Sequence, residues 1–190
     1  MKYPVGIIVL AVSLLFSCKE TKEQDKIVYD VVFRESLAGT YQKWQTSDNS
    51  YKYYYTYTDR GRGPEYNEEI SLSDENFITA QTVKGNNNSK VAIDESFLVA
   101  DGTATINNMF GTSKDDFKGD QLYFRFDGSP AVYEILAQLA LNSKTGKVAL
   151  YPKGEAELTK KTPLKLSNGA ALDLLIMKGL DLNPTYIRMQ

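Results

Sequence analysis

The chain of 190 residues contains no histidine and a single cysteine, Cys18. Without histidine it cannot form a Ser-His-Asp or Cys-His catalytic arrangement, a histidine-ligated zinc site or an imidazole base that titrates near neutral pH. These absences predict that the chain alone is not an enzyme and that it holds no catalytic residue, metal site or cofactor. The net charge of −2 gives no reason to expect nucleic acid as a partner.

Carboxylates are the only common acid and base groups that remain. Adjacent pairs of them occur at Glu68-Glu69, Asp94-Glu95 and Asp115-Asp116. Neighbours on a strand point to opposite faces of the sheet, so the two members of such a pair cannot flank one substrate. A glycosidase-like pair would have to form between strands. We therefore interpret these carboxylates as solvated or ion-paired.

The N-terminus resembles the signal peptide of a bacterial lipoprotein. Lys2 supplies a positive start, and the apolar run at 5–16 is too short to span a bilayer. The sequence Leu15-Phe16-Ser17-Cys18 closes the run in the manner of a lipobox, in which the cysteine is lipidated and becomes the mature N-terminus. Residues 1–17 are then the signal peptide. The alternatives are a plain secretory signal with an unrelated cysteine, or an uncleaved anchor.

An acylated Cys18 would leave no free thiol and would attach the protein to a membrane almost permanently. Residues 18–26 are charged and lack apolar periodicity, so we predict a lipidated cysteine followed by a flexible tether. The expected location is the bacterial cell envelope, with the lipid anchor in the outer membrane and the protein periplasmic or surface-exposed. Acidic residues in the tether resemble surface-export signals of some bacteria, although a plain spacer explains them equally well.

Residues 27–190 predict a single domain, α+β and mostly β. Short runs rich in β-branched and aromatic residues alternate with turn residues, which is typical of an antiparallel meander. The predicted strands cover residues 27–33, 40–46, 51–58, 66–72, 77–84, 91–99, 103–106, 122–126, 147–151, 155–159, 163–166, 170–178 and 185–189. Residues 107–119 lack a pattern, so a loop is expected there. Asp101-Gly102 favours a tight hairpin.

One helix is predicted after residue 128. Ser129 can cap it, Pro130 suits its first position, and five apolar residues then recur at helical spacing: Val132, Ile135, Leu136, Leu139 and Ala140. One helix cannot bury such a stripe alone. We therefore expect it to pack across a curved, half-barrel-like sheet.

The stretch from Tyr51 to Pro64 contains the candidate ligand-binding residues. Tyr53, Tyr55 and Tyr57 share one face of a strand with Tyr51. Packed inward, this face is core with hydroxyls at its rim. Left open on a concave sheet, it suits an apolar or sugar ligand.

Arg62 lies between two glycines in the turn that follows. Its guanidinium is either accessible to an anion or paired with an internal carboxylate. The carboxylates considered as internal partners are Glu68, Glu69, Asp94 and Glu95.

Five motifs together resemble the N-terminal β-rich extension of some secreted bacterial amidohydrolases, relatives of imidazolonepropionase. In order they are Asp59-Arg60-Gly61-Arg62-Gly63-Pro64, Asp94-Glu95-Ser96-Phe97, Ser129-Pro130 before the helix, Leu150-Tyr151-Pro152-Lys153-Gly154-Glu155-Ala156, and Gly179-Leu180-Asp181-Leu182-Asn183-Pro184-Thr185-Tyr186. The resemblance covers most of the chain after the tether. Those enzymes continue into a metal-dependent (β/α)₈ barrel with a His-x-His pair, which has no counterpart here. The resemblance therefore implies no catalytic residue.

The preferred functional hypothesis is a membrane-anchored lipoprotein that acts as a non-catalytic accessory or binding domain. One alternative is a half-barrel carrier of an apolar small molecule. Another is the N-terminal part of a truncated or split metal-dependent amidohydrolase, whose barrel would be a separate partner. The membrane, reached through acylated Cys18, is the partner common to all three.

Overall fold

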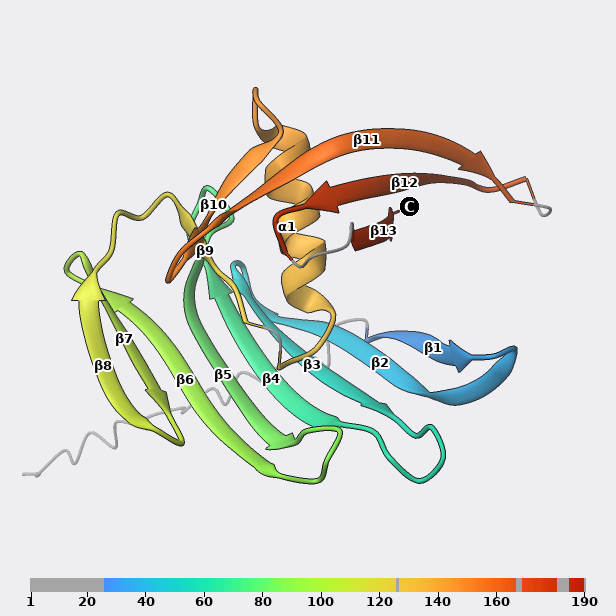
Figure 1. Cartoon of the computed structure of the whole chain (residues 1–190), viewed down its shortest axis with the longest axis horizontal. Helices are drawn as coiled ribbons and strands as arrows, with labels where there is room; N and C mark the ends of the chain where they lie inside the picture. The colour runs from blue at the N-terminus through green and yellow to red at the C-terminus, as the bar shows by residue number, and fades with distance from the viewer. Residues whose placement is uncertain (1–25, 126, 167–168, 181–184, 190) are drawn as a thin grey trace, which may run out of the picture.

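The structure is a computed structural model that describes residues 26–125, 127–166, 169–180 and 185–189 (Figure 1). These residues form two β-sheets and one helix. The larger sheet is strongly curved, and the helix and the smaller sheet lie on its concave side (Figure 1). The predicted class, α+β and mostly β, with a curved antiparallel sheet and one packed helix, is confirmed. The signal peptide, Cys18 and most of the tether lie outside the described residues.

Eight antiparallel strands form the larger sheet in the order of the sequence. They are β1 (Ile27–Phe33), β2 (Ser36–Ser47), β3 (Ser50–Tyr57), β4 (Glu65–Leu72), β5 (Ile78–Asn86), β6 (Ala92–Ala100), β7 (Thr103–Asn108) and β8 (Gly111–Asp116). In a meander of this kind, every second turn lies at the same end of the sheet. The turns after β1, β3, β5 and β7 therefore share one end.

The smaller sheet has five strands in the order β13-β12-β11-β10-β9. Its strands are β9 (Gln121–Tyr123), β10 (Lys147–Tyr151), β11 (Glu155–Lys165), β12 (Ala171–Lys178) and β13 (Thr185–Met189). β9 and β10 pair in parallel, whereas the other neighbours are antiparallel. A parallel pair needs a crossover connection, and helix α1 (Ala131–Asn142) supplies it.

Two sequence predictions about strands are wrong. Residues 107–119 do not form a loop, because β8 runs from Gly111 to Asp116 and pairs with β7. Every residue of β8 is exposed, so this edge strand carries no apolar alternation that a sequence pattern could detect. The strands predicted at 155–159 and 163–166 are one continuous strand, β11, whose register shifts between Leu158 and Lys160.

The turn and helix predictions can also be checked. Asp101 and Gly102 have φ values of 49° and 73°, which is the two-residue turn expected between β6 and β7. All five residues of the predicted apolar stripe of α1 are buried. The helix begins at Ala131, so Pro130 stands just before the first helical position. Pro130 makes no side-chain cap, but the Ser129 Oγ accepts a hydrogen bond from the Ala131 N–H at 3.2 Å and so satisfies an N–H at the start of the helix, as predicted for Ser129.

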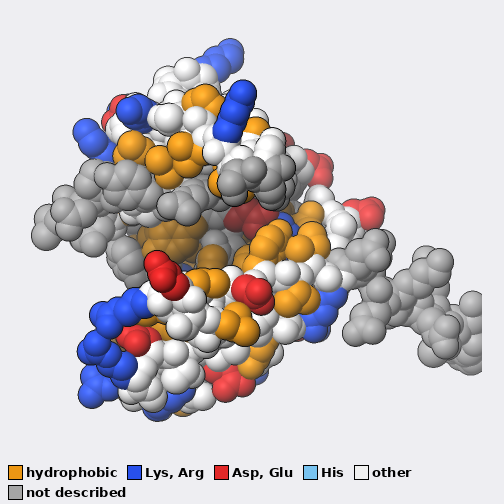
Figure 2. All heavy atoms as spheres, turned by 90° about the vertical axis from the view of Figure 1, so that its right-hand side faces the viewer, with side chains coloured by type: hydrophobic (Ala, Val, Ile, Leu, Met, Phe, Trp, Pro, Cys, Tyr) orange, Lys and Arg blue, Asp and Glu red, His pale blue; other side chains and the backbone are white. Residues whose placement is uncertain are grey.

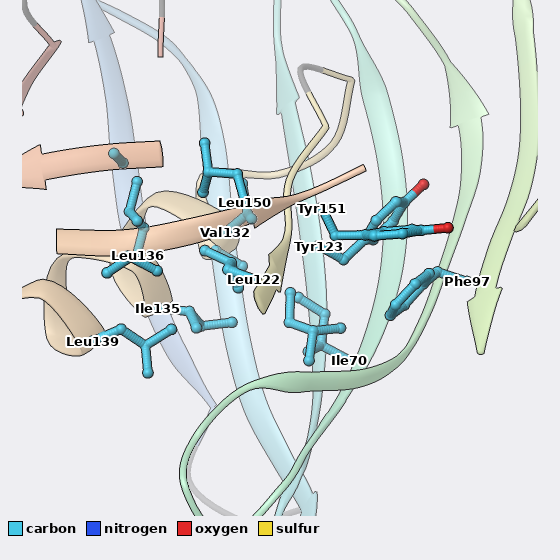
Figure 3. Packing of buried hydrophobic residues seen from close by; sticks show 14 of the residues in the cluster. Ile70, Phe97, Leu122, Tyr123, Val132, Ile135, Leu136, Leu139, Leu150 and Tyr151 are labelled. Atoms are coloured by element: carbon cyan, nitrogen blue, oxygen red, sulfur yellow. The ribbon is translucent and has the colours of Figure 1, made fainter. Parts of the chain in front are cut away.

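The core fills the space between the larger sheet, the helix and the smaller sheet. Its central side chains include Ile70 of β4, Leu122 of β9 and Leu136 of α1, all at most 1% exposed (Figure 3). Burying one such side chain contributes about 1.5–3 kcal/mol relative to leaving it in water. Phe97 of β6 stacks on Tyr123 of β9 with ring centroids 4.0 Å apart, which joins the two sheets.

Candidate functional site

The tyrosine strand of the sequence is β3, and its side chains alternate as predicted. Tyr51, Tyr53, Tyr55 and Tyr57 lie on the concave face, where Tyr53 stacks on Tyr41 of β2 with centroids 6.1 Å apart. The opposite face is polar. There Lys52 pairs with Glu69 at 2.8 Å, and the Tyr54 hydroxyl donates a hydrogen bond to Glu65 at 3.3 Å. The four concave tyrosines differ in what covers them.

Tyr53 belongs to the core. Its side chain is 3% exposed and packs in the same cluster as Ile70, Leu136 and Met177. Burial raises the pKa of Tyr53, and the nearby carboxylates of Glu134 and Glu68 raise it further. The structure therefore places this candidate ligand-binding residue inside the protein and not on a pocket wall.

Tyr55 and Tyr57 instead line two neighbouring pockets, which we together call the tyrosine groove. The larger pocket has a volume of about 490 Å³, and its walls are formed by Phe33, Tyr57, Asp59, Arg60, Arg62, Gly63 and Asn88. The smaller pocket has a volume of about 230 Å³, and its walls are formed by Tyr55, Tyr57, Pro64, Tyr66, Asn88, Asp127, Gly128, Ser129, Pro130 and Tyr133. Tyr57 and Asn88 belong to both pockets. The larger volume falls in the range of about 300–1,000 Å³ that is usual for small-molecule sites.

At two glycines the backbone approaches the end of β3 so closely that no side chain would fit. A Cβ atom at Gly39 of β2 would lie 2.0 Å from the Thr56 carbonyl oxygen. A Cβ atom at Gly63, whose φ is +157°, would lie 1.8 Å from the Tyr57 carbonyl oxygen. Only glycine permits both approaches. The corner after β3 can therefore fold closely against the end of that strand.

The corner itself is a tight two-residue turn. Arg60 and Gly61 have φ values of 51° and 78°, and the backbones of Asp59 and Arg62 exchange hydrogen bonds of 2.7 and 3.0 Å. Positive φ at both central residues defines the turn that matches the twist of paired strands. Arg60 therefore stands at the tip of the turn, and Arg62 stands beside Asp59 at its base.

Arg62 does not pair with any of the carboxylates considered as its internal partners. Glu69 pairs with Lys52, Asp94 pairs with Lys84 at 3.6 Å, and Glu95 pairs with Arg125. Glu68 is buried and accepts hydrogen bonds from Gln81 and Ser129. Among the described residues no carboxylate lies within ion-pair distance of the Arg62 guanidinium, which is exposed at the wall of the larger pocket.

The tyrosine hydroxyls on the inner side of the groove are neutral hydrogen-bonding groups. Burial, with a contribution from Tyr57, raises the pKa of Tyr55 to about 12. Burial also raises the pKa of Tyr66 to about 12, with Asp127 adding to the rise. These two side chains therefore present apolar rings and uncharged hydroxyls to a ligand near neutral pH.

Glu68 lies behind the smaller pocket and is the most buried carboxylate among the described residues, at 1% exposure. The Ser129 N–H donates to its Oε2 at 2.9 Å, and the Gln81 amide donates to its Oε1. Burial raises the pKa of Glu68, while these hydrogen bonds oppose the rise. Because Gly128 and Ser129 form part of the pocket wall, Glu68 fixes that wall to β4.

Several residues of the groove were not indicated as site residues by the sequence, notably Phe33, Asp59 and Asn88. The turns after β1, β3 and β5 lie at one end of the meander, so the order of predicted strands was enough to bring these residues together. Tyr66 lies on β4 directly opposite Tyr55 of β3, so the same order of strands brings it to the groove. Asp127 and Tyr133 had no such signal, because they reach the groove from the segment before α1 and from the first turn of α1.

No metal site is found in the part of the chain that the structure describes, where no three acidic, histidine or cysteine side chains cluster. The same residues contain no helix long and apolar enough to cross a bilayer. Comparison of the chain with protein-family models, with curated proteins and with solved structures finds no match. The resemblance to the extension of amidohydrolases therefore stays a prediction from the motifs.

Proposed function

We propose that this protein is a membrane-anchored bacterial lipoprotein that acts as a non-catalytic binding domain, with the tyrosine groove as its ligand site. One observation carries the binding role. The concave face of β3 is packed into the core at Tyr53 but lines open pockets at Tyr55 and Tyr57. Aromatic side chains that are left uncovered beside polar groups in a concave site are typical of ligand recognition.

The membrane anchor rests on the lipobox that ends at Cys18. The tether from residue 18 to residue 26 has nine residues and extends at most roughly 30 Å, given about 3.3–3.6 Å per residue. The groove would therefore act close to the membrane surface. Labelling with radioactive palmitate tests the anchor: the native protein incorporates the label and fractionates with membranes, whereas Cys18→Ala does neither. Equal labelling of both proteins contradicts the proposal.

Binding is tested with two tyrosines of the same strand. Tyr57→Ala removes a ring from both pockets, whereas Tyr54→Ala removes a ring from the opposite face. The purified variants are applied to a panel of immobilised oligosaccharides and fatty acids. We expect Tyr57→Ala to lose retention of the ligand that the native protein retains, and Tyr54→Ala to keep it. Equal retention by both variants contradicts a site in the groove.

The accessory role proposed from the amidohydrolase motifs requires a second chain that supplies the metal ligands. The downstream reading frame tests this relation directly. A neighbouring frame that encodes a (β/α)₈ barrel with a His-x-His pair supports an accessory or split-enzyme role. In its absence the binding role of the groove stands alone.

An apolar carrier is the second candidate, and one observation favours it. A hollow between the two sheets has hydrophobic side chains on its walls (Figure 2). On the edge strand β1, Ile27 and Tyr29 are each 49% exposed, and Tyr29 stacks on Tyr41 of the concave face. Native mass spectrometry of the protein from its own membranes tests this candidate. A co-purified lipid supports it, and its consistent absence contradicts it.

A further inference from the structure

We propose that the larger pocket of the tyrosine groove binds a negatively charged saccharide that carries carboxylates on its sugar rings, such as a uronic-acid oligosaccharide. The inference rests on the proposed binding function and names the ligand class of the same site. Three features of the pocket carry it. They are an excess of cations, two parallel aromatic rings and a hydrogen-bonded amide at the wall.

Cations outnumber carboxylates on the wall of this pocket. Arg60 and Arg62 face it, and Asp59 is the only acidic residue among the described residues of its wall. The whole chain carries a net charge of −2, so the local charge is opposite in sign to that of the protein. Like charges gathered in a concave site attract a ligand of the opposite sign.

Two more cations lie just outside the pocket. Lys90 Nζ donates a hydrogen bond to the Gly63 carbonyl at 2.9 Å, and the Arg34 guanidinium lies 6.0 Å from the centre of the Phe33 ring. Gly63 and Phe33 are both wall residues. The positive charge therefore extends along the rim, as a ligand with more than one negative group requires.

Arg62 is held in a geometry that suits a carboxylate. Its backbone is fixed by the two hydrogen bonds to Asp59, while its side chain has no ion pair among the described residues. A guanidinium presents planar, paired N–H donors that match the two oxygens of a carboxylate. Because Arg62 has no carboxylate partner in the described part of the chain, binding such a group breaks no ion pair there.

Flat apolar surface lies beside these charges. The rings of Phe33 and Tyr57 are nearly parallel, with an angle of 4° and centroids 6.4 Å apart. The C–H face of a sugar ring is also flat and apolar, so it packs on an aromatic face while its hydroxyls point outward. A simple inorganic anion would leave both rings unused.

The polar groups of the wall account for the hydroxyls of the ligand. The Tyr57 hydroxyl donates to Asn88 Oδ1 at 3.2 Å, which orients the amide and leaves its nitrogen to donate elsewhere. Asp59 adds an acceptor. An apolar ligand would remove water from these groups without replacing its hydrogen bonds, which is costly. The larger pocket is therefore a poor site for the apolar carrier function.

The test is calorimetric titration of the mature protein with two matched probes. Oligogalacturonate carries a carboxylate on each ring, and oligogalactose is its neutral counterpart. We expect oligogalacturonate to bind at least roughly tenfold more tightly, because a hydrogen bond between a guanidinium and a carboxylate is stronger than one to a neutral hydroxyl. We also expect its affinity to fall as salt is added.

Two arginine variants sharpen the test. Arg62→Ala and Arg60→Asn each should weaken oligogalacturonate binding roughly tenfold and leave oligogalactose unaffected. Asparagine is chosen at position 60 because it tolerates the positive φ of 51° found there. Lys160→Ala, which removes an exposed cation from β11 of the other sheet, is the matched control and should change neither affinity. Thermal melting checks that each variant is folded.

Each outcome separates the ligand class from the binding function. Equal affinity for both probes, lost in Tyr57→Ala, overturns the charge requirement and keeps the groove as a site. If inorganic phosphate or sulfate competes as strongly as oligogalacturonate, the proposal of a saccharide ligand is overturned and the pocket is a simple anion site. If a sulfated saccharide binds and a carboxylated one does not, the proposed specificity for a carboxylate is overturned. If neither probe binds, the proposal of a saccharide ligand is overturned. The groove would still be supported as a binding site if the native protein retains another ligand of the panel and Tyr57→Ala does not.

Discussion

Tyr53 and Tyr57 stand on the same face of the same strand, yet their surroundings differ. Tyr53 is 3% exposed and stacks on Tyr41 within the core. Tyr57 is half-buried, stacks on Phe33 and lines both pockets of the tyrosine groove. The difference shows that the alternation of a strand determines which face a side chain occupies, but not whether that face is covered.

What covers the face comes from elsewhere in the chain. Helix α1 approaches the larger sheet where Lys43 of β2 pairs with Glu134 at 2.5 Å, and the same lysine lies 5.4 Å from the centre of the Tyr51 ring. Tyr57, in contrast, is the last residue of β3 and adjoins the corner turn. One face thus has a structural part near the helix and an open part at the turns.

The largest expected effect on stability comes from breaking the covered part. Tyr53→Ala should lower the free energy of unfolding by about 3–5 kcal/mol, because it removes a large buried ring and leaves a cavity. Tyr57→Ala should lower it by less than about 1 kcal/mol, because that ring is partly in water. Urea denaturation of both variants measures the difference. Equal losses would contradict the distinction between the two tyrosines.

The corner that positions Tyr57 is tested by adding one methyl group. Gly63→Ala should destabilise the protein by about 1–3 kcal/mol, since its Cβ would lie 1.8 Å from the Tyr57 carbonyl oxygen. Gly61→Ala has no atom within 4 Å of its Cβ and should cost less, although its φ of +78° is also unfavourable for alanine. Thermal unfolding distinguishes them. A larger loss for Gly61→Ala would contradict the proposed close approach.

The buried carboxyl behind the groove predicts a pH dependence. The pKa of Glu68 in the folded state is raised above its ordinary value of 4.5, so the folded state holds this proton more tightly than the unfolded state. Its contribution to stability is therefore complete below pH 4.5 and falls as the pH rises through the raised pKa. Glu68→Gln cannot ionise at this position. As the pH rises through this range, its free energy of unfolding should therefore increase relative to that of the native protein. A constant difference across the pH series would contradict a raised pKa.

The same site gives a second, pH-independent comparison. Glu68→Ala should cost about 1–3 kcal/mol, because the Ser129 N–H and the Gln81 amide would lose a buried acceptor. Glu68→Gln keeps an acceptor of similar shape and should cost less. Glu69→Ala, which removes the exposed neighbour, is the control and should change the free energy of unfolding by no more than about 1 kcal/mol.

The smallest expected effect comes from an unpaired hydroxyl next to Tyr53. The Tyr41 hydroxyl is buried and has no hydrogen-bond partner among the described residues. Tyr41→Phe should therefore leave the free energy of unfolding unchanged or raise it by about 1 kcal/mol, because an unsatisfied buried group is removed. Thermal melting measures the shift. A clear loss of stability would indicate that the hydroxyl has a partner in solution.

Much of the fold could be predicted from the sequence because most strands have one buried face. Runs of β-branched and aromatic residues between turn residues located β1 and β3 to β7, and helical spacing located α1. The all-exposed strand β8 and the parallel pairing of β9 with β10 could not be predicted, because the first has no apolar face and the second depends on a crossover. In the groove, the sequence indicated Tyr55, Tyr57 and Arg62. It could not show that Tyr53 is covered, because the cover comes from distant parts of the chain.

We propose that the open part of the tyrosine face binds a ligand while the covered part supports the fold. Parallel titration of Tyr57→Ala and Tyr54→Ala with oligogalacturonate, with unfolding measured on the same samples, tests it most directly. We expect both variants to remain folded, Tyr54→Ala to bind as the native protein does, and Tyr57→Ala to bind roughly tenfold more weakly. Native affinity in a folded Tyr57→Ala variant would contradict it.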